Sequence, residues 1–265
     1  MTDSNMGNTE NNVLKMASDV VGVKSSVADL DLAGKVGHLH PMTQTINEIS
    51  KIFAEMGFQV AEGPEIETEF NNFDALNVPK DHTSRDMQDT FWLKDVGPEG
   101  ERMLPRTHTS PVQIRFMQSH TPPFRIIAPG KVFRNESTDA THEAEFYQVE
   151  GMYIDKNVSL ANLKFVLESF VKKFFGEETE MRFRPSYFPF VEPGFEIDIR
   201  WKDRWLEVCG AGLVRPEVMK AGGINGEEWQ GFAFGMGLDR IVMLKYGIDD
   251  IRNMYSGDLR FVNQF

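Results

Sequence analysis

The segment FRNESTDATHEAEFYQVEG (residues 133–151) decides how the rest of the chain is interpreted. Apolar residues at both of its ends favour two strands, and the polar stretch between them favours a loop. Alternation along the first strand places Arg134 and Glu136 on one face. An arginine offers a planar fork of donors to phosphate oxygens, and a carboxylate accepts hydrogen bonds from an amine such as the amino group of adenine.

A second segment with a similar meaning, GMGLDR (residues 235–240), follows about a hundred residues later. Its glycines let the backbone approach a ligand closely, and Arg240 is expected in the first turn of the helix that follows. The two segments together suggest a nucleotide held at both ends. Taken separately, an Arg-x-Glu pattern is most often a surface salt bridge, and a glycine-rich turn is most often only a turn.

The region before these segments predicts a helix and a strand. Apolar residues spaced by three and four, from Met42 to Met56, form one helix face, and Gly57 is a stop signal. Residues 58–66 are expected to form a strand interrupted by Gly63-Pro64, which belongs at an edge or an interface. Residues 69–93 are polar and are expected to form a loop.

Two further elements are readable from local patterns. A helix is expected from Ser159 as N-cap to Gly176 as its end. The alternation of residues 195–201, a turn at Lys202-Asp203 and a returning strand at residues 205–208 predict a hairpin within an antiparallel sheet.

The order of these elements resembles the three signature motifs of class II aminoacyl-tRNA synthetases. The segments RTHTSP (106–111), YFPFVEPG (187–194) and GFAFG (231–235) resemble the catalytic alpha subunit of bacterial phenylalanyl-tRNA synthetases. The resemblance runs from about Asp29 to Phe265. It implies an α+β fold with an antiparallel sheet flanked by helices, a catalytic domain over residues 31–265, and a flexible or short helical arm over residues 1–30 in place of the coiled coil of the family.

The resemblance also implies the nucleotide site. Arg134 is expected to hold the α-phosphate of ATP, Glu136 the adenine amino group, His142 the outer phosphates and Arg240 the γ-phosphate, with Gly237 beside the nucleotide. Mg²⁺ is expected to bridge the phosphates. Glu192 matches a carboxylate that binds Mg²⁺ jointly with the beta subunit.

The amino-acid site is implied in the same way. The residues expected to hold the ammonium and carboxylate groups of the substrate are His108, Ser110, Gln113, Gln148 and Glu150. Phe188 and Phe190 are expected to contact the benzyl ring, and Ala233 and Gly235 to leave room for it. The residues alone leave other interpretations open, because Thr109 or Ser110 can cap a helix that begins near Pro111, and the two phenylalanines can be core residues.

Composition limits the partners. The chain has 28 Lys and Arg against 40 Asp and Glu, a net charge of −12, so indiscriminate binding to a polyanion is unfavourable. Any RNA contact is therefore local or supplied by a partner chain. One cysteine, Cys209, excludes an internal disulfide and predicts a small buried side chain. No apolar run is long enough to span a bilayer and no signal peptide is visible, so the cytoplasm is the default compartment.

The expected function is that of a phenylalanine–tRNA ligase alpha subunit, which activates phenylalanine with ATP and transfers it to tRNA(Phe) as part of an alpha2beta2 heterotetramer. The end of the chain, residues 259–265, leaves no room for the anticodon-binding domain of the single-chain organellar form. Two alternatives remain: a synthetase-like paralogue that activates an amino acid without charging tRNA, and a non-catalytic binding module. The presence of both arginines argues against the second.

Overall fold

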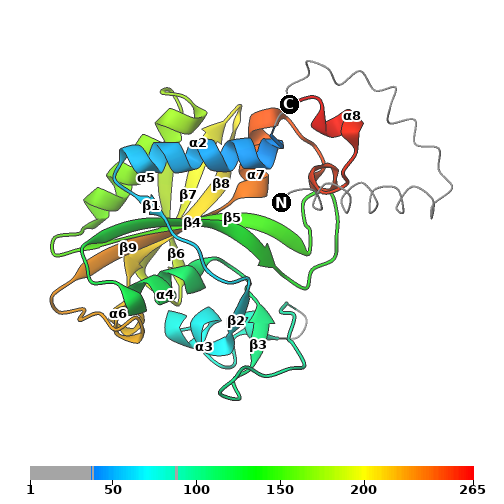
Figure 1. Ribbon diagram of the computed structural model, residues 1–265. Helices are drawn as coiled ribbons and strands as arrows, with labels where there is room; N and C mark the ends of the chain where they lie inside the picture. Colours follow the sequence, from blue (N-terminus) through cyan, green and yellow to red (C-terminus); the bar gives the residue numbers. More distant parts are fainter. Residues whose placement is uncertain (1–36, 38, 87–88) are drawn as a thin grey trace, which may run out of the picture. The chain divides into compact units, whose positions relative to one another are not determined.

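The fold is built on one large sheet. The computed structural model describes residue 37 and residues 39–86 and 89–265, so the expected N-terminal arm (residues 1–30) lies outside the described residues. Within that part, seven strands have the order β1-β4-β5-β9-β8-β7-β6 (Figure 1). All neighbours run antiparallel except β1 (Gln59–Val60), which is parallel to β4 (Phe124–Phe133). The expected α+β class and antiparallel sheet are confirmed, with one parallel edge strand added.

The remaining elements follow along the chain. The other strands of the large sheet are β5 (Glu145–Asp155), β6 (Met181–Phe188), β7 (Val191–Trp201), β8 (Arg204–Val214) and β9 (Gln230–Gly237), and a small sheet pairs β2 (Ile66–Thr68) with β3 (Met103–Pro105). The α-helices are α2 (Pro41–Glu55), α3 (Glu69–Asn72), α4 (Ser110–Ser119), α5 (Leu160–Phe175), α6 (Pro216–Ala221), α7 (Leu238–Tyr246) and α8 (Leu259–Val262). The 3-10 turns are η2 (Asp74–Leu76), η3 (Thr83–Arg85) and η4 (Ile251–Met254).

Helices cover both faces of the large sheet, and each face has its own core (Figure 1). On one face α2 packs with α5 and α7, and the ring of Phe53 stacks at 5.1 Å on both Phe170 and Phe234. On the other face, α4 and α6 bury a second cluster that includes Ile114 and Met219. Burial of aromatic and branched side chains on both faces is the main source of stability here.

Strand alternation divides the side chains of β9 between these two faces. Phe232, Phe234 and Met236 belong to the core beneath α2 and α5. Alternate residues on a strand point to opposite faces, so Ala233, Gly235 and Gly237 lie on the other face. That face holds the cavity described below.

The two predicted long helices are confirmed. The apolar face of α2 is buried through Met42, Ile49 and Phe53, as the spacing predicted. Helix α5 begins with a capping box between Ser159 and Asn162 and ends at Gly176. The hairpin is also confirmed, since β7 and β8 pair antiparallel around a turn in which Lys202 has a φ of 54°.

Two predictions were wrong in detail. Residues 58–66 do not form one strand, because only Gln59–Val60 pairs with β4 and the chain reaches β2 at Ile66 after Gly63-Pro64. Residues 69–93 are not a simple loop. They contain α3 and two 3-10 turns, anchored by the buried Arg85, which forms salt bridges with Glu69 at 3.2 Å and Asp74 at 2.7 Å. Such long-range ion pairs leave no periodic signal in the sequence.

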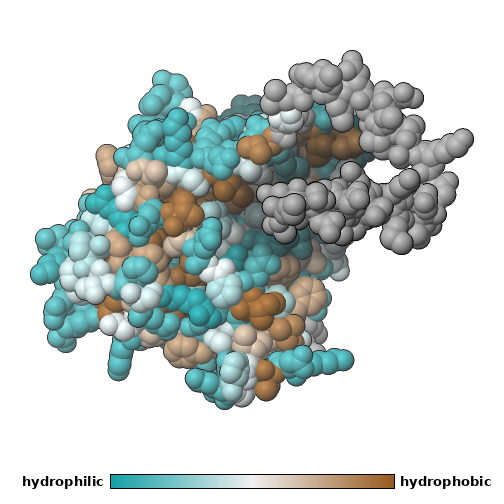
Figure 2. Space-filling view, viewed as in Figure 1, coloured by the Kyte–Doolittle hydropathy of each residue, from teal (hydrophilic) through white to brown (hydrophobic). Residues whose placement is uncertain are grey.

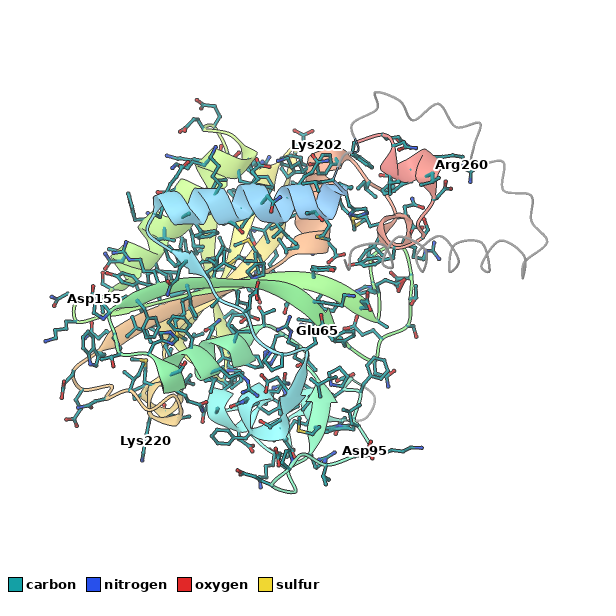
Figure 3. The ribbon with its side chains drawn as sticks, viewed as in Figure 1. Glu65, Asp95, Asp155, Lys202, Lys220 and Arg260 are labelled. Carbon is teal, nitrogen blue, oxygen red and sulfur yellow. The ribbon has the colours of Figure 1, made fainter. Side chains whose placement is uncertain are left out.

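The face of the molecule shown in Figure 2 carries both hydrophilic and hydrophobic residues, and the hydrophobic ones lie in separate patches. Of the six charged residues labelled in Figure 3, Asp155 is half-buried. The exposed ones are Glu65, Asp95, Lys202, Lys220 and Arg260. In the part of the chain that the structure describes, no helix has the length and apolar character needed to cross a membrane.

Candidate active site

A cavity of about 930 Å³ opens on the face of the sheet that carries α4 and α6. Its walls come from β5, β6, β8 and β9, from the start of α4 and α7, and from the segment between β2 and β3. The lining includes most of the residues predicted for the two substrates, namely His108, Ser110, Gln113, Arg134, Glu136, Gln148, Glu150, Phe188, Phe190, Ala233, Gly235, Gly237 and Arg240. These residues lie up to 132 positions apart in sequence, from His108 to Arg240, and meet in one pocket.

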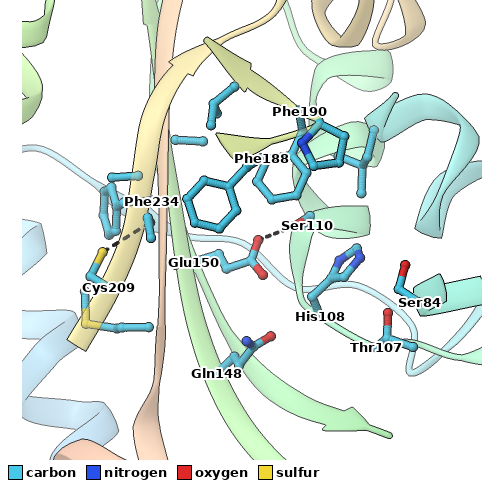
Figure 4. Close-up of a pocket in the computed structure, with 18 of the residues that line it drawn as sticks. Ser84, Thr107, His108, Ser110, Gln148, Glu150, Phe188, Phe190, Cys209 and Phe234 are labelled. Carbon is cyan, nitrogen blue, oxygen red and sulfur yellow. Dashed lines mark hydrogen bonds between the residues drawn. The ribbon is translucent and has the colours of Figure 1, made fainter. Parts of the chain in front are cut away.

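Glu150 is a buried carboxylate at the centre of the cavity (Figure 4). It accepts hydrogen bonds from the Thr109 backbone N–H at 3.1 Å, from the Ser110 hydroxyl, and from the Gln113 side-chain amide at 2.9 Å. Burial raises its pKa from 4.5 to about 7, and these hydrogen bonds act in the opposite direction. A buried carboxylate that faces a cavity suits a cationic ligand such as an ammonium group.

The same network corrects the expected cap of α4. Thr109 occupies the N-cap position and Pro111 the first turn, as predicted, but no side chain caps the helix. The Thr109 N–H and the Ser110 hydroxyl instead donate to Glu150. The first turn of α4 therefore orients the carboxylate.

Space beside Glu150 depends on Gly235. The two residues are directly opposite each other on β5 and β9. A Cβ atom at position 235 would lie 2.9 Å from the Glu150 Cγ, closer than real Cβ contacts. Because glycine has no Cβ atom, the Glu150 side chain can pack directly against the backbone of β9.

An aromatic pair forms the wall above Glu150 (Figure 4). The rings of Phe188 and Phe190 lie 5.8 Å apart between centroids with an interplanar angle of 23°, so they are nearly parallel. Both residues are half-buried and line the cavity. An apolar ring from a ligand can pack against this pair while a cationic group on the same ligand reaches Glu150.

Two buried polar atoms on the cavity wall have no hydrogen-bond partner in the described structure: Nδ1 of His108 and Oε1 of Gln148. Burial, together with the positive charges of Arg134 and Arg106, lowers the pKa of His108 to about 3, so its imidazole is neutral. Buried polar groups are normally paired. The Gln148 oxygen is therefore positioned to accept a hydrogen bond from a bound ligand, and Nδ1 of the neutral His108 ring to donate or accept one according to its tautomer.

Arg134 and Arg240 line the same cavity and supply its positive charge. Strand β4 ends at Phe133, so the expectation that Arg134 and Glu136 alternate on a strand is wrong. They still approach each other, with 3.9 Å between guanidinium and carboxylate. The Arg134 guanidinium donates to the Thr107 carbonyl at 3.3 Å and lies 4.9 Å from the centroid of the Phe146 ring. Burial lowers the pKa of Arg134, and Glu136 opposes that shift.

Arg240 lies in the first turn of α7, where the glycine pattern predicted it. It is exposed, and among the described residues no hydrogen bond or ion pair occupies its guanidinium. A free guanidinium at the mouth of a cavity can bind phosphate oxygens with two parallel hydrogen bonds.

Comparisons with known proteins identify the family of the chain. The family model of the tRNA synthetases class II core domain (F) matches residues 29–265. The chain is 48% identical to a phenylalanine–tRNA ligase alpha subunit of Agrobacterium fabrum, over 96% of this chain and 75% of that one. It is also 48% identical to one of Synechocystis, over 95% of this chain and 75% of that one. The chain belongs to the phenylalanine–tRNA ligase alpha-subunit family of class II synthetases.

A distant solved structure shares the fold. The pyrrolysyl-tRNA synthetase of Desulfitobacterium hafniense superposes with a TM-score of 0.64 at 18% sequence identity, covering 96% of this chain and 86% of that one. At that identity the likeness concerns the class II fold alone.

Two of the residues predicted from the synthetase family do not line the cavity. His142 is exposed in the loop between β4 and β5, and its Nδ1 lies 3.0 Å from both carboxylate oxygens of Asp139. Glu192 is exposed on β7 and forms a 2.8 Å salt bridge with Arg215. The described structure does not bring either side chain to the pocket.

Other residues of the pocket were not predicted. Phe146 precedes Gln148 and Glu150 at alternate positions of β5, so the strand pattern could have placed it on their face. Glu207 lies on β8, where alternation was visible, but alternation alone does not say which face meets the pocket. His82, Ser84 and Asp89 line the cavity from the segment read as a loop, and no sequence signal pointed to them.

Proposed function

We propose that this chain activates phenylalanine with ATP and then transfers it to tRNA(Phe), as the alpha subunit of a class II phenylalanine–tRNA ligase. The observation that carries the proposal is the position of Glu150. It lies between the Phe188 and Phe190 rings on one side and Gln148 on the other, inside a cavity that Arg134 and Arg240 also line. A zwitterionic aromatic ligand and a polyanionic nucleotide can therefore occupy neighbouring parts of one pocket.

Phenylalanine would bind with its ammonium group at Glu150 and its ring against Phe188 and Phe190. Binding a cation favours the ionised carboxylate, so ligand binding offsets the burial that raises the pKa of Glu150. The unpaired His108 and Gln148 atoms lie on the same wall and would hold the substrate carboxylate or ammonium. Ala233, whose side chain is a single methyl group, would limit the depth available to the ring.

ATP would bind at the arginine end of the cavity. The substrate carboxylate attacks the α-phosphorus of ATP in line, the bond to the pyrophosphate oxygen breaks, and the products are phenylalanyl-adenylate and pyrophosphate. The negative charge that accumulates on the phosphoryl oxygens requires fixed positive charge, which Arg134 and Arg240 supply. Glu136 would accept from the adenine amino group, and Gly237 leaves the backbone of β9 open beside the nucleotide.

The residues of the pocket fit a magnesium ion that is bound mainly by ATP. Mg²⁺ in such sites usually has one or two carboxylate ligands together with phosphate oxygens and water. Glu207 is a carboxylate on the cavity wall that can serve in this way. Among the described residues there is no group of three or more acidic, His or Cys side chains that could hold a metal. Bound Mg²⁺ would neutralise charge on the phosphates.

Two further roles are proposed without contacts in the pocket. His142 would reach the outer phosphates if the loop that carries it closes over ATP. Glu192 would bind Mg²⁺ jointly with the beta subunit, which requires its salt bridge with Arg215 to open.

The proposed assembly is an alpha2beta2 heterotetramer in the cytoplasm. The net charge of −12 disfavours a broad RNA-binding surface on this chain, so the beta subunit would provide much of the contact with tRNA(Phe). Val60, Ile66 and Phe70, on or near β1 and β2, are exposed apolar residues that a subunit interface would cover. The terminal ribose of the tRNA would attack the adenylate carbonyl, releasing AMP.

Aminoacylation assays test this function. The full chain, co-expressed with the beta subunit from the same genome, should charge tRNA(Phe) with phenylalanine. Formation of phenylalanyl-adenylate without any charging would support a paralogue that only activates the amino acid. Absence of both reactions would contradict the proposal.

A further inference from the structure

The last part of the described chain contacts both elements that carry the arginines of the pocket. The segment 250–255 includes the turn η4 and lies beside the loop that joins β4 to β5 (Figure 1). The Ile251 backbone N–H donates to the Ala140 carbonyl of that loop at 2.9 Å. The Tyr255 hydroxyl donates to a carboxylate oxygen of Asp239 in the first turn of α7. One short segment therefore connects the loop after Arg134 with the helix of Arg240.

Asp239 is a buried carboxylate with a defined set of partners. It is only 3% exposed, and its second oxygen accepts from the Tyr147 backbone N–H on β5 at 2.6 Å. Burial raises the pKa of Asp239, while the bonds from Tyr255 and Tyr147 oppose that rise. Removing a hydrogen-bond donor from a buried carboxylate destabilises the folded structure, because the carboxylate has no water to replace the lost bond. The position of the first turn of α7 thus depends on both tyrosines.

Asp239 and Arg240 are consecutive residues of α7, so they point about 100° apart around the helix axis. Asp239 faces β5 and η4, and Arg240 faces the cavity. Among the described residues the Arg240 guanidinium makes no hydrogen bond or ion pair, although its charge acts on Glu207. The first turn of α7, held through Asp239, therefore sets the position from which Arg240 reaches the cavity.

Electrostatic interactions also connect the segment 250–255 with the β4–β5 loop. The paired Asp250 is the main cause of the raised pKa of Arg252, and Asp139 and Glu143 of the loop contribute to it. Arg252 therefore lies in the field of two acidic loop residues. Asp139 also holds His142, the residue proposed to reach the outer phosphates.

We propose that the segment 250–255 sets the distance between the β4–β5 loop and the first turn of α7, and that Tyr255 is a positioning residue for the nucleotide site. Its hydroxyl holds Asp239, and Asp239 holds the turn from which Arg240 reaches the phosphates. This inference rests on the proposed function in assigning ATP to the arginine end of the pocket. Tyr255 itself does not line the cavity.

The test is Tyr255→Phe in the full chain co-expressed with the beta subunit. The substitution removes one hydroxyl and leaves the ring, which packs against the core. We expect the Kd for ATP, measured by calorimetry without amino acid, to rise roughly tenfold, because Asp239 loses a hydrogen bond while buried. The Kd for phenylalanine should stay within about twofold, since Glu150 shares no partner with Asp239.

Matched variants separate positioning from general loss of structure. Tyr246→Phe removes a tyrosine hydroxyl from α7 that makes no hydrogen bond to the described residues, and it should leave both constants unchanged. Asp239→Asn should weaken ATP in the same way. In the double variant the two effects should add to less than their sum, because both include loss of the hydrogen bond between Tyr255 and Asp239. If Tyr255→Phe fails to fold, Asp239→Asn with Tyr246→Phe as control carries the test.

An unchanged Kd for ATP in a folded Tyr255→Phe or Asp239→Asn variant would overturn the inference. So would equal losses of ATP and phenylalanine affinity, because they would indicate a structural defect. The proposed function fails separately, if the wild-type complex binds ATP but shows no phenylalanine-dependent pyrophosphate exchange.

Discussion

Glu150 and Gly235 lie directly opposite each other on β5 and β9, and a methyl group at position 235 would lie 2.9 Å from the Glu150 side chain. Glycine at this position is thus a condition for the carboxylate to occupy the centre of the pocket. The carboxylate is in turn held by the first turn of α4. The geometry of the pocket therefore depends on the close contact between β5 and β9 and on the hydrogen bonds from the first turn of α4.

Gly235→Ala should therefore impair the amino-acid site. Because the methyl group must displace Glu150, we expect the Kd for phenylalanine to rise roughly tenfold or more, while ATP binding changes little. Calorimetric titration with each ligand measures both. Gly226→Ala, whose new methyl group makes only ordinary contacts at 3.6 Å, is the matched control. Wild-type phenylalanine affinity in Gly235→Ala would contradict the close contact.

The affinity for phenylalanine should depend on pH through Glu150. Its pKa is raised to about 7 in the free protein, so the carboxylate becomes protonated as the pH falls below that value. An ammonium ion binds the ionised form, and the Kd should therefore rise about tenfold for each pH unit below 7. Glu150→Gln should bind weakly and without this dependence. A wild-type Kd that is constant from pH 5.5 to 8 would contradict the assignment.

Glu150 should also make the stability of the unliganded protein depend on pH, but in the opposite direction: low pH should favour folding, whereas it weakens phenylalanine binding. A carboxylate whose pKa is higher in the folded state than in the unfolded state favours folding at low pH, and this contribution is lost as the pH rises from 4.5 to about 7. Relative to wild type, Glu150→Gln should become more stable across that range by up to about 3 kcal/mol. Denaturant unfolding without ligand at pH 5 and pH 8 measures the difference. A difference that does not change with pH would show that the carboxyl is not shifted.

Ala233 should limit the size of the ring that enters the pocket. Ala233→Gly removes a methyl group from the cavity wall, so para-substituted phenylalanines should become substrates for pyrophosphate exchange. Ala233→Val should instead reduce the use of phenylalanine itself. If Ala233→Gly uses the analogues no better than wild type does, Ala233 does not limit the size of the ring.

Cys209 should be unreactive although it lines the cavity. Burial raises the pKa of its thiol to about 12, so almost no thiolate is present at pH 8. Iodoacetamide should label the denatured chain and leave the folded chain largely unlabelled over the same time. Rapid labelling of the folded protein would mean that Cys209 is more accessible than the structure shows.

Local signals predicted the elements that local interactions determine. The apolar spacing of α2, the capping residues of α5 and the alternation of the β7–β8 hairpin were all readable, because each depends on neighbours a few residues away. The predicted strand over residues 58–66 was wrong because its pairing with β4 is limited to Gln59–Val60. Only the three-dimensional arrangement determines such pairing.

The residues of the site were predicted mainly from family resemblance. The structure adds contacts between residues that are far apart in the sequence. Alternation along β8 indicated that Glu207 lies on one face of the strand, but it did not indicate that this face lines the pocket. The bonds from Ser110 and Gln113 to Glu150 join residues 40 and 37 positions apart, and no periodicity reports them. The same holds for the connection from Tyr255 to Asp239, which gives the aspartate beside Arg240 a structural role.

We propose that phenylalanine and ATP react in one pocket, which Arg134 and Arg240 line. The most direct test is amino-acid-dependent exchange of pyrophosphate into ATP, measured with all twenty amino acids on the chain co-expressed with its beta subunit. We predict exchange with phenylalanine and about a hundredfold weaker exchange with tyrosine, because an apolar pocket rejects one added hydroxyl only modestly. Arg134→Ala and Arg240→Ala should each lower the rate by about a hundredfold or more, and the surface control Arg260→Ala should not. Full exchange in both pocket variants, or no exchange with phenylalanine in the wild type, would contradict the account.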